Sequence, residues 1–93
     1  MTDFVFHPSA VLSFETVEGN DKRFSKKLAA RKNLISASID LAKVTRCDST
    51  GLAFLIAAKR LCQQRQIIFN IENMSETVKA LVKFCGVNEV ILE

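Results

Sequence analysis

Residues 46–52 read Arg-Cys-Asp-Ser-Thr-Gly-Leu and separate a strand-like segment from a long segment that favours helix. Residues 38–44, which precede them, alternate in polarity and include branched residues, as a buried strand does. Residues 52–65, which follow, are dense in good helix formers. Side-chain oxygens at positions 48–50 therefore lie where a strand turns into a helix. An oxygen placed there can cap the helix, bind an anion or carry a phosphate.

Length and composition predict one ordinary globular domain over residues 1–93. The chain is 48% apolar and 25% charged, and it has no apolar run long enough to span a membrane. Its first residues lack the pattern of a signal peptide, so we expect a cytoplasmic protein. Three cysteines without Cys-x-x-Cys spacing indicate neither a disulfide framework nor a zinc site.

The order of local patterns predicts an α/β fold. We expect strands at residues 4–6, 10–14, 37–41, 67–71 and 90–92. We expect helices at about residues 21–32, from the turn at Asp48 to about residue 64, and at residues 76–85. Ser75 is a good cap for the last helix, and Gly86 is a good residue to end it. An initial hairpin followed by alternating strands and helices predicts a mixed, mostly parallel sheet of about four to five strands, with three main helices packed on it.

Basic residues are concentrated in the first predicted helix. Six of them fall within eleven residues: Lys22, Arg23, Lys26, Lys27, Arg31 and Lys32. They form either a solvated helix face or a contact with an acidic partner or an anionic membrane surface. Nucleic acid is not an expected partner, because the chain has no Tyr or Trp to stack on bases.

The helix after the turn carries apolar residues on more than one face. Five of them form a stripe that predicts the core face: Phe54, Leu55, Ala58, Leu61 and Cys62. Leu52 and Ile56 point nearly the opposite way, beside Lys59 and Gln63. Either Leu52 and Ile56 are buried against a neighbouring helix, or they form an exposed patch for a partner.

No set of residues predicts catalysis. His7 is the only histidine, and without it no Ser-His-Asp arrangement can be assembled. The chain has no Gly-rich phosphate loop and no carboxylate pair spaced for a metal ion. We therefore expect no enzyme activity, no cofactor and no metal site. Helix capping alone is the simplest explanation for the oxygens at positions 48–50.

The motif resembles that of a STAS domain, the fold of bacterial anti-sigma-factor antagonists. Residues 39–44 read Ile-Asp-Leu-x-x-Val and residues 48–53 read Asp-Ser-Thr-Gly-Leu-Ala, and the resemblance extends over residues 36–93. The N-terminal third matches only in the order of its predicted elements, and it lacks the Gly-rich strand-to-helix sequence common in the family. In the antagonists, a partner kinase phosphorylates the hydroxyl residue just before the glycine. The resemblance implies Thr50 for that role.

A second branch of the family is the small STAS subunit of Mla-type phospholipid ABC transporters, which binds the ATPase subunit. The important hydroxyl there follows the aspartate directly, which implies Ser49, so either hydroxyl is a candidate for phosphorylation. The chain has Gly-Leu-Ala at residues 51–53, where antagonists commonly have Gly-Leu-Gly. Outward-facing Leu52 and Ile56 also suit a lasting contact better than a reversible switch.

The prediction is therefore a non-enzymatic cytoplasmic subunit that binds and supports a transporter ATPase. It would be peripheral to the inner membrane through its complex, without inserting into the bilayer. The expected partner-binding residues are Asp48, Ser49, Thr50, Leu52, Ile56, Lys59 and Gln63. The alternative is an anti-sigma-factor antagonist switched by phosphorylation of Thr50, with an anti-sigma-factor kinase as its partner. A small-molecule or nucleotide sensor that uses the helix N-terminus is a third class, but it has no dedicated residues.

Overall fold

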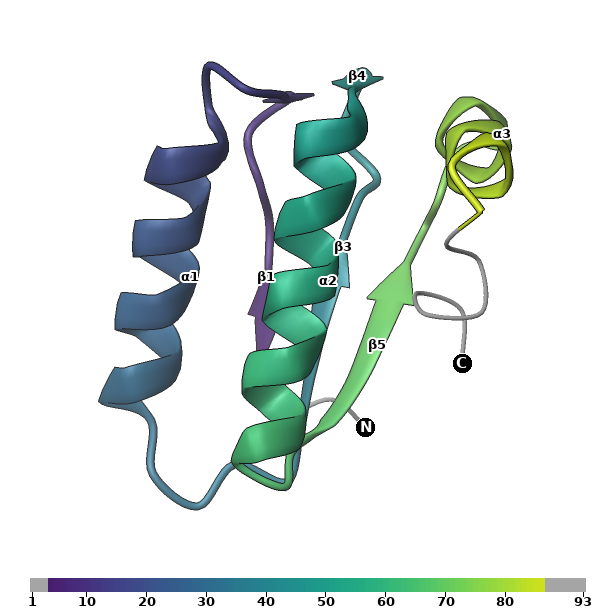
Figure 1. Ribbon diagram of the computed structural model, residues 1–93. Helices are drawn as coiled ribbons and strands as arrows, with labels where there is room; N and C mark the ends of the chain where they lie inside the picture. Colours follow the sequence, from purple (N-terminus) through teal and green to yellow (C-terminus); the bar gives the residue numbers. More distant parts are fainter. Residues whose placement is uncertain (1–3, 87–93) are drawn as a thin grey trace.

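The computed structural model describes residues 4–86 and has an α/β architecture with three helices (Figure 1). The elements in chain order are β1 (Val5–Phe6), β2 (Val11–Leu12), α1 (Val17–Ala30), β3 (Ser36–Asp40), β4 (Arg46–Cys47), α2 (Ser49–Gln64), β5 (Ile68–Glu72) and α3 (Glu76–Phe84). The predicted fold class is confirmed. The strand predicted at residues 90–92 lies outside the described residues.

All strand pairs in the described part of the chain are parallel. One sheet has the order β1-β3-β5, and a second, smaller sheet pairs β2 with β4. The initial hairpin predicted from the sequence was therefore wrong. The connector at residues 7–10 has no Asn-Gly or Asp-Gly pair to reverse the chain. Instead, β1 pairs in parallel with β3, and β2 pairs in parallel with β4 in the other sheet.

Helix α1 begins four residues earlier than its predicted start at residue 21, because Asn20 lies inside it rather than breaking it. The Asn20 side chain is only 1% exposed. Its Oδ1 accepts the Ser9 N–H at 3.0 Å, and its Nδ2 donates to the Thr16 carbonyl at 3.0 Å. These bonds fix the β1–β2 connector against the first turn of α1.

Helices α2 and α3 begin where local capping residues predicted them. Asp48 caps α2 by accepting the Gly51 N–H at 3.0 Å, and Ser75 caps α3 by accepting the Val78 N–H at 3.2 Å. Gly86 follows α3 with φ of +70°, the left-handed conformation that suits glycine at a helix end. The predicted roles of Ser75 and Gly86 are confirmed.

The core lies between the three-stranded sheet and helices α1 and α2, which stand side by side over one face (Figure 1). Its centre is a cluster of aromatic rings from three elements. The Phe24 ring of α1 lies 5.3 Å from the Phe6 ring of β1 and 6.1 Å from the Phe54 ring of α2, both edge to face. These ring contacts join both helices to the sheet.

Gly51 allows the first turn of α2 to approach β2 closely. A Cβ atom at this position would overlap the carbonyl oxygen of Leu12 and would lie 2.9 Å from the Cys47 sulfur. The Leu12 carbonyl cannot move freely, because it accepts the Asp48 N–H at 3.2 Å. Glycine at position 51 is therefore required by packing, not by backbone conformation.

Truncation of the ring cluster should destabilise the fold strongly. We expect Phe54→Ala to lower the free energy of unfolding by about 3–5 kcal/mol, because it leaves a cavity among buried rings. Urea denaturation followed by circular dichroism measures this difference. Phe84→Ala, at a side chain that is 89% exposed, is the control and should change stability by less than about 0.5 kcal/mol. Similar losses from the two variants would contradict the assignment of the core.

The two helical glycines should respond in opposite directions to the same substitution. Gly51→Ala should lower the free energy of unfolding by about 1–3 kcal/mol, because the new methyl group meets fixed backbone. Gly19→Ala should raise it by about 0.5–1 kcal/mol, since nothing lies within 4 Å of a Cβ atom there and alanine favours helix. Thermal melts of both variants provide the measurement. A stabilising effect of Gly51→Ala would refute the close approach of α2 to β2.

Candidate functional site

Asp48 has a structural role at the turn between β4 and α2. Its carboxylate accepts the Gly51 N–H at 3.0 Å and the Phe14 N–H at 3.2 Å, so it joins α2 to the segment after β2. Backbone hydrogen bonds from Gly51 and then Phe14 hold the pKa of this carboxyl below its usual value. Asp48 is thus the ionised cap of α2, whereas Ser49 and Thr50, the other two capping candidates, lie in the first turn of the helix.

The two hydroxyl residues occupy different surroundings in the first turn of α2. Ser49 is exposed, whereas Thr50 is half-buried. Thr50 lines a shallow groove of about 270 Å³ between α1 and α2, together with Val17, Asp21, Ala53, Phe54 and Ala57. A modification of Thr50 would therefore take place beside a carboxylate of α1.

The prediction that Leu52 is exposed was wrong. Leu52 is only 2% exposed and belongs to the core, while Ile56 is half-buried and packs against it. The reason is that α2 contacts α1, β4 and β5, so its buried arc is wider than one stripe. Of the other two predicted contact residues, Lys59 is half-buried and Gln63 is exposed.

One accessible side of α2, which we call the α2 outer face, includes Ile56 and five residues that were not predicted as contacts. These residues surround a shallow depression of about 430 Å³ and are Ala53, Ile56, Ala57, Arg60, Leu61 and Gln64. Leu61 was predicted to lie in the core stripe, but it is half-buried and lines this depression. Ser49 lies four residues before Ala53 and so on the same side of the helix. Ala53 and Ala57 were not predicted as site residues. The sequence pattern that could have indicated them is two small residues four positions apart on one helix.

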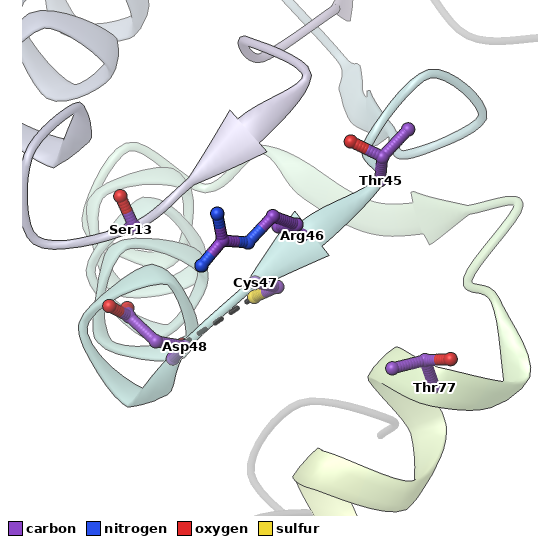
Figure 2. A pocket seen from close by; sticks show the side chains of 6 residues that line it. All are labelled: Ser13, Thr45, Arg46, Cys47, Asp48 and Thr77. Atoms are coloured by element: carbon purple, nitrogen blue, oxygen red, sulfur yellow. Dashed lines mark hydrogen bonds between the residues drawn. The ribbon is translucent and has the colours of Figure 1, made fainter.

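A polar pocket of about 230 Å³ lies at the end of the molecule where α2 begins (Figure 2). Its lining residues are Ser13, Thr45, Arg46, Cys47, Asp48 and Thr77. Burial, and then the Asp48 charge, raise the pKa of the Cys47 thiol to about 11. The thiol stays protonated at neutral pH and is a poor nucleophile.

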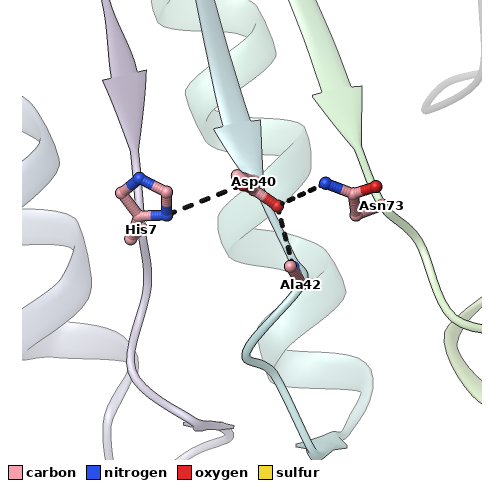
Figure 3. A network of polar contacts seen from close by, with 4 residues as sticks. All are labelled: His7, Asp40, Ala42 and Asn73. Atoms are coloured by element: carbon pink, nitrogen blue, oxygen red, sulfur yellow. Dashed lines mark hydrogen bonds and ion pairs between the residues drawn. The ribbon is translucent and has the colours of Figure 1, made fainter.

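The carboxyl ends of β1, β3 and β5 are joined by a polar network around Asp40 (Figure 3). The Asp40 carboxylate accepts the Asn73 side-chain amide and the Ala42 N–H, each at 2.9 Å. These bonds, Asn73 first, hold the pKa of Asp40 below its usual value. His7 Nδ1 lies 3.8 Å from the same carboxylate. The network ties the three strand ends together.

Among residues 4–86, no group of three or more His, Cys, Asp and Glu side chains could hold a metal ion. In the same residues, no helix is both long enough and apolar enough to cross a membrane.

Comparisons with known proteins agree with this fold. A crystal structure of a sulfate transporter family protein from Wolinella succinogenes is similar, with a TM-score of 0.75 and 17% sequence identity over 94% of this chain and 69% of that chain. This likeness concerns the fold alone. No curated protein matches the chain. The family model described as "Mlab, STAS domain" matches residues 20–93. The chain therefore belongs to this family of STAS domains.

Proposed function

We propose that this STAS domain is a non-enzymatic cytoplasmic subunit that binds and supports the ATPase of a phospholipid-transport ABC complex, which maintains lipid asymmetry. STAS domains are small regulatory or interaction domains, and the family match covers most of the chain. The finer assignment rests on the surface that this chain offers to a partner.

The α2 outer face is the observation that carries the proposal. Ala53 and Ala57 are exposed and small, so another protein can approach the helix backbone there. Ile56 and Leu61 add partly accessible apolar area on either side, and Arg60 supplies a charge for orientation. An apolar centre with a polar border is the usual arrangement of a subunit interface. Ser49 lies at one end of this surface.

The surroundings of Thr50 favour a lasting contact over a phosphorylation switch. Thr50 is half-buried and shares its groove with Asp21 of α1. A phosphate on Thr50 would bring nearly two negative charges next to that carboxylate, which is electrostatically unfavourable. The groove also continues into the α2 outer face through Ala53 and Ala57. Thr50 is therefore placed better for contact than for modification.

A charge on the α2 outer face should abolish partner binding. We expect tagged protein purified from its own cells to retain an ABC ATPase, and Ala53→Glu to reduce the retained ATPase by about tenfold or more, because a buried unpaired charge is costly. Ala80→Glu is the matched control, since Ala80 is an exposed alanine in the helix α3. It should leave binding unchanged. Circular dichroism should show that both variants keep the wild-type fold.

Two results of this purification would contradict the proposal. Retention of an anti-sigma factor or its kinase in place of an ABC ATPase would favour the antagonist function. Equal loss of the ATPase from Ala53→Glu and Ala80→Glu would show that the α2 outer face is not the binding surface.

Charge at Thr50 should matter more than its hydroxyl group. Thr50→Ala should keep most of the bound ATPase, whereas Thr50→Glu should lose it because the carboxylate must be desolvated in the interface. Both variants should fold, since Asp48 supplies the cap. An antagonist would give the same pair of results, so intact-mass spectrometry of protein from growing and starved cells separates the two functions. A fraction heavier by one phosphate that changes with growth state would overturn the transporter assignment.

A further inference from the structure

Positive and negative side chains are segregated along the sequence. Residues 22–39 contain six basic residues and no acidic residue, and residues 49–71 contain Lys59, Arg60 and Arg65 and no acidic residue. Both segments cover the C-terminal part of a helix and the connection to the next strand. The carboxylates of the described chain are thus excluded from two helix ends and two loops.

The fold brings these two segments to the same end of the molecule. Helices α1 and α2 both end there, and the loops to β3 and β5 run beside each other (Figure 1). The Arg65 guanidinium joins them, since it donates to the Leu28 carbonyl at 2.9 Å and to the Arg31 carbonyl at 3.1 Å. We call this surface the basic end. Its exposed members are Lys26, Lys27, Arg31, Lys32, Arg60 and Arg65.

Part of the basic end is held in place by aromatic rings. The Lys27 ammonium lies 5.9 Å from the centre of the Phe6 ring, and the Arg31 guanidinium lies 5.7 Å from the centre of the Phe4 ring. Arg23 lies over Phe6 in the same row. Cation–π contacts restrict these long side chains, so less conformational entropy is lost when they bind a partner.

Carboxylates lie toward the opposite end of the molecule. Asp40 and Glu72 are at the carboxyl ends of β3 and β5, and Asp48 and Glu76 are at the N-terminal ends of α2 and α3. Within residues 4–86, no carboxylate belongs to the segments that form the basic end. The basic end therefore has a field of one sign, which attracts an anionic surface.

Two exposed isoleucines accompany the basic residues. Ile35 is 68% exposed and Ile68 is 61% exposed. They stand at the amino ends of neighbouring strands β3 and β5, and the Ile68 N–H donates to the Ile35 carbonyl at 2.9 Å. Large branched side chains so exposed at the same end of the molecule as the basic residues serve neither the core nor solubility. They can enter an apolar layer that lies beneath a layer of anionic groups.

We propose that the basic end adsorbs to the surface of a bilayer that contains anionic phospholipid. Lysine and arginine side chains bind the headgroup phosphates, while Ile35 and Ile68 enter the boundary between headgroups and acyl chains. An acidic protein would satisfy the charges, but the exposed isoleucines favour a bilayer, where charge and shallow apolar burial act together. The domain lies on the membrane and does not span it.

This adsorption can be tested separately from the proposed ATPase contact. The α2 outer face extends along one side of α2 from Ala53 to Gln64, whereas the basic end lies where α1 and α2 terminate, and the two surfaces meet at Arg60. Arg60 belongs to both surfaces and is therefore left unchanged in the tests. Ala53→Glu should bind vesicles as the wild type does, so failure of one proposal is distinguishable from failure of the other.

Vesicle flotation of the purified protein tests the proposal directly. We expect binding to phosphatidylcholine vesicles that contain about 30% phosphatidylglycerol, and little binding to phosphatidylcholine alone. Raising the NaCl concentration from about 0.1 M to about 0.5 M should weaken binding about tenfold, because salt screens charges outside the protein. Equal binding to both vesicle types, or no binding to the anionic ones, would overturn the proposal. The second result would leave an acidic protein as the partner of the basic end.

Two double variants with the same change in net charge distinguish the effect of the basic end on vesicle binding from the effect of net charge alone. Lys26→Glu with Lys32→Glu should weaken binding to anionic vesicles about tenfold or more. Lys43→Glu with Lys83→Glu changes the net charge equally at exposed positions away from the basic end, and should weaken binding less than about threefold. Similar losses from both pairs would overturn the proposal. Ile35→Ser leaves the charge unchanged and should still reduce binding; unchanged binding would refute the role of the isoleucine.

Discussion

The Asp48 carboxylate is the interaction on which the arrangement of α2 depends. It accepts one N–H from the first turn of α2 and one from Phe14, which follows β2. The absence of a side chain at Gly51 then allows the helix to pack against the Leu12 carbonyl. The ionised Asp48 cap and the lack of a side chain at Gly51 thus hold α2 against the smaller sheet. Every surface of α2 is oriented by this attachment.

Once α2 is fixed there, its residues are divided among several neighbours. Phe54 joins the ring cluster with Phe6 and Phe24, and Leu52 is buried toward the strands. The accessible outer face of the helix carries the small residues Ala53 and Ala57 beside Ile56 and Leu61. An interaction domain needs an accessible surface of this kind on a rigid support. The two proposals use different parts of this frame, one on the side of α2 and one at the ends of α1 and α2.

Local sequence patterns were sufficient to predict the features that depend on a few neighbouring residues. Asp48, Ser75 and Gly86 mark helix ends because capping bonds and left-handed backbone act within one turn. The start and length of α2, the position of β3 and the fold class were predicted for this reason. The STAS motif at residues 48–53 is likewise a local pattern, and the family match agrees with it.

The tertiary structure alone decided which segments become neighbours. Residues 5–6 and 11–12 pair in parallel with strands more than thirty residues away, so their partners could not be predicted from neighbouring residues. Asn20 continues α1 because its amide is buried against the β1–β2 connector, and Leu52 is buried because α2 touches more than one element. The sequence by itself determined the ends of α2 and α3, since their capping bonds are local. Contacts between distant segments determined which of their residues remain accessible.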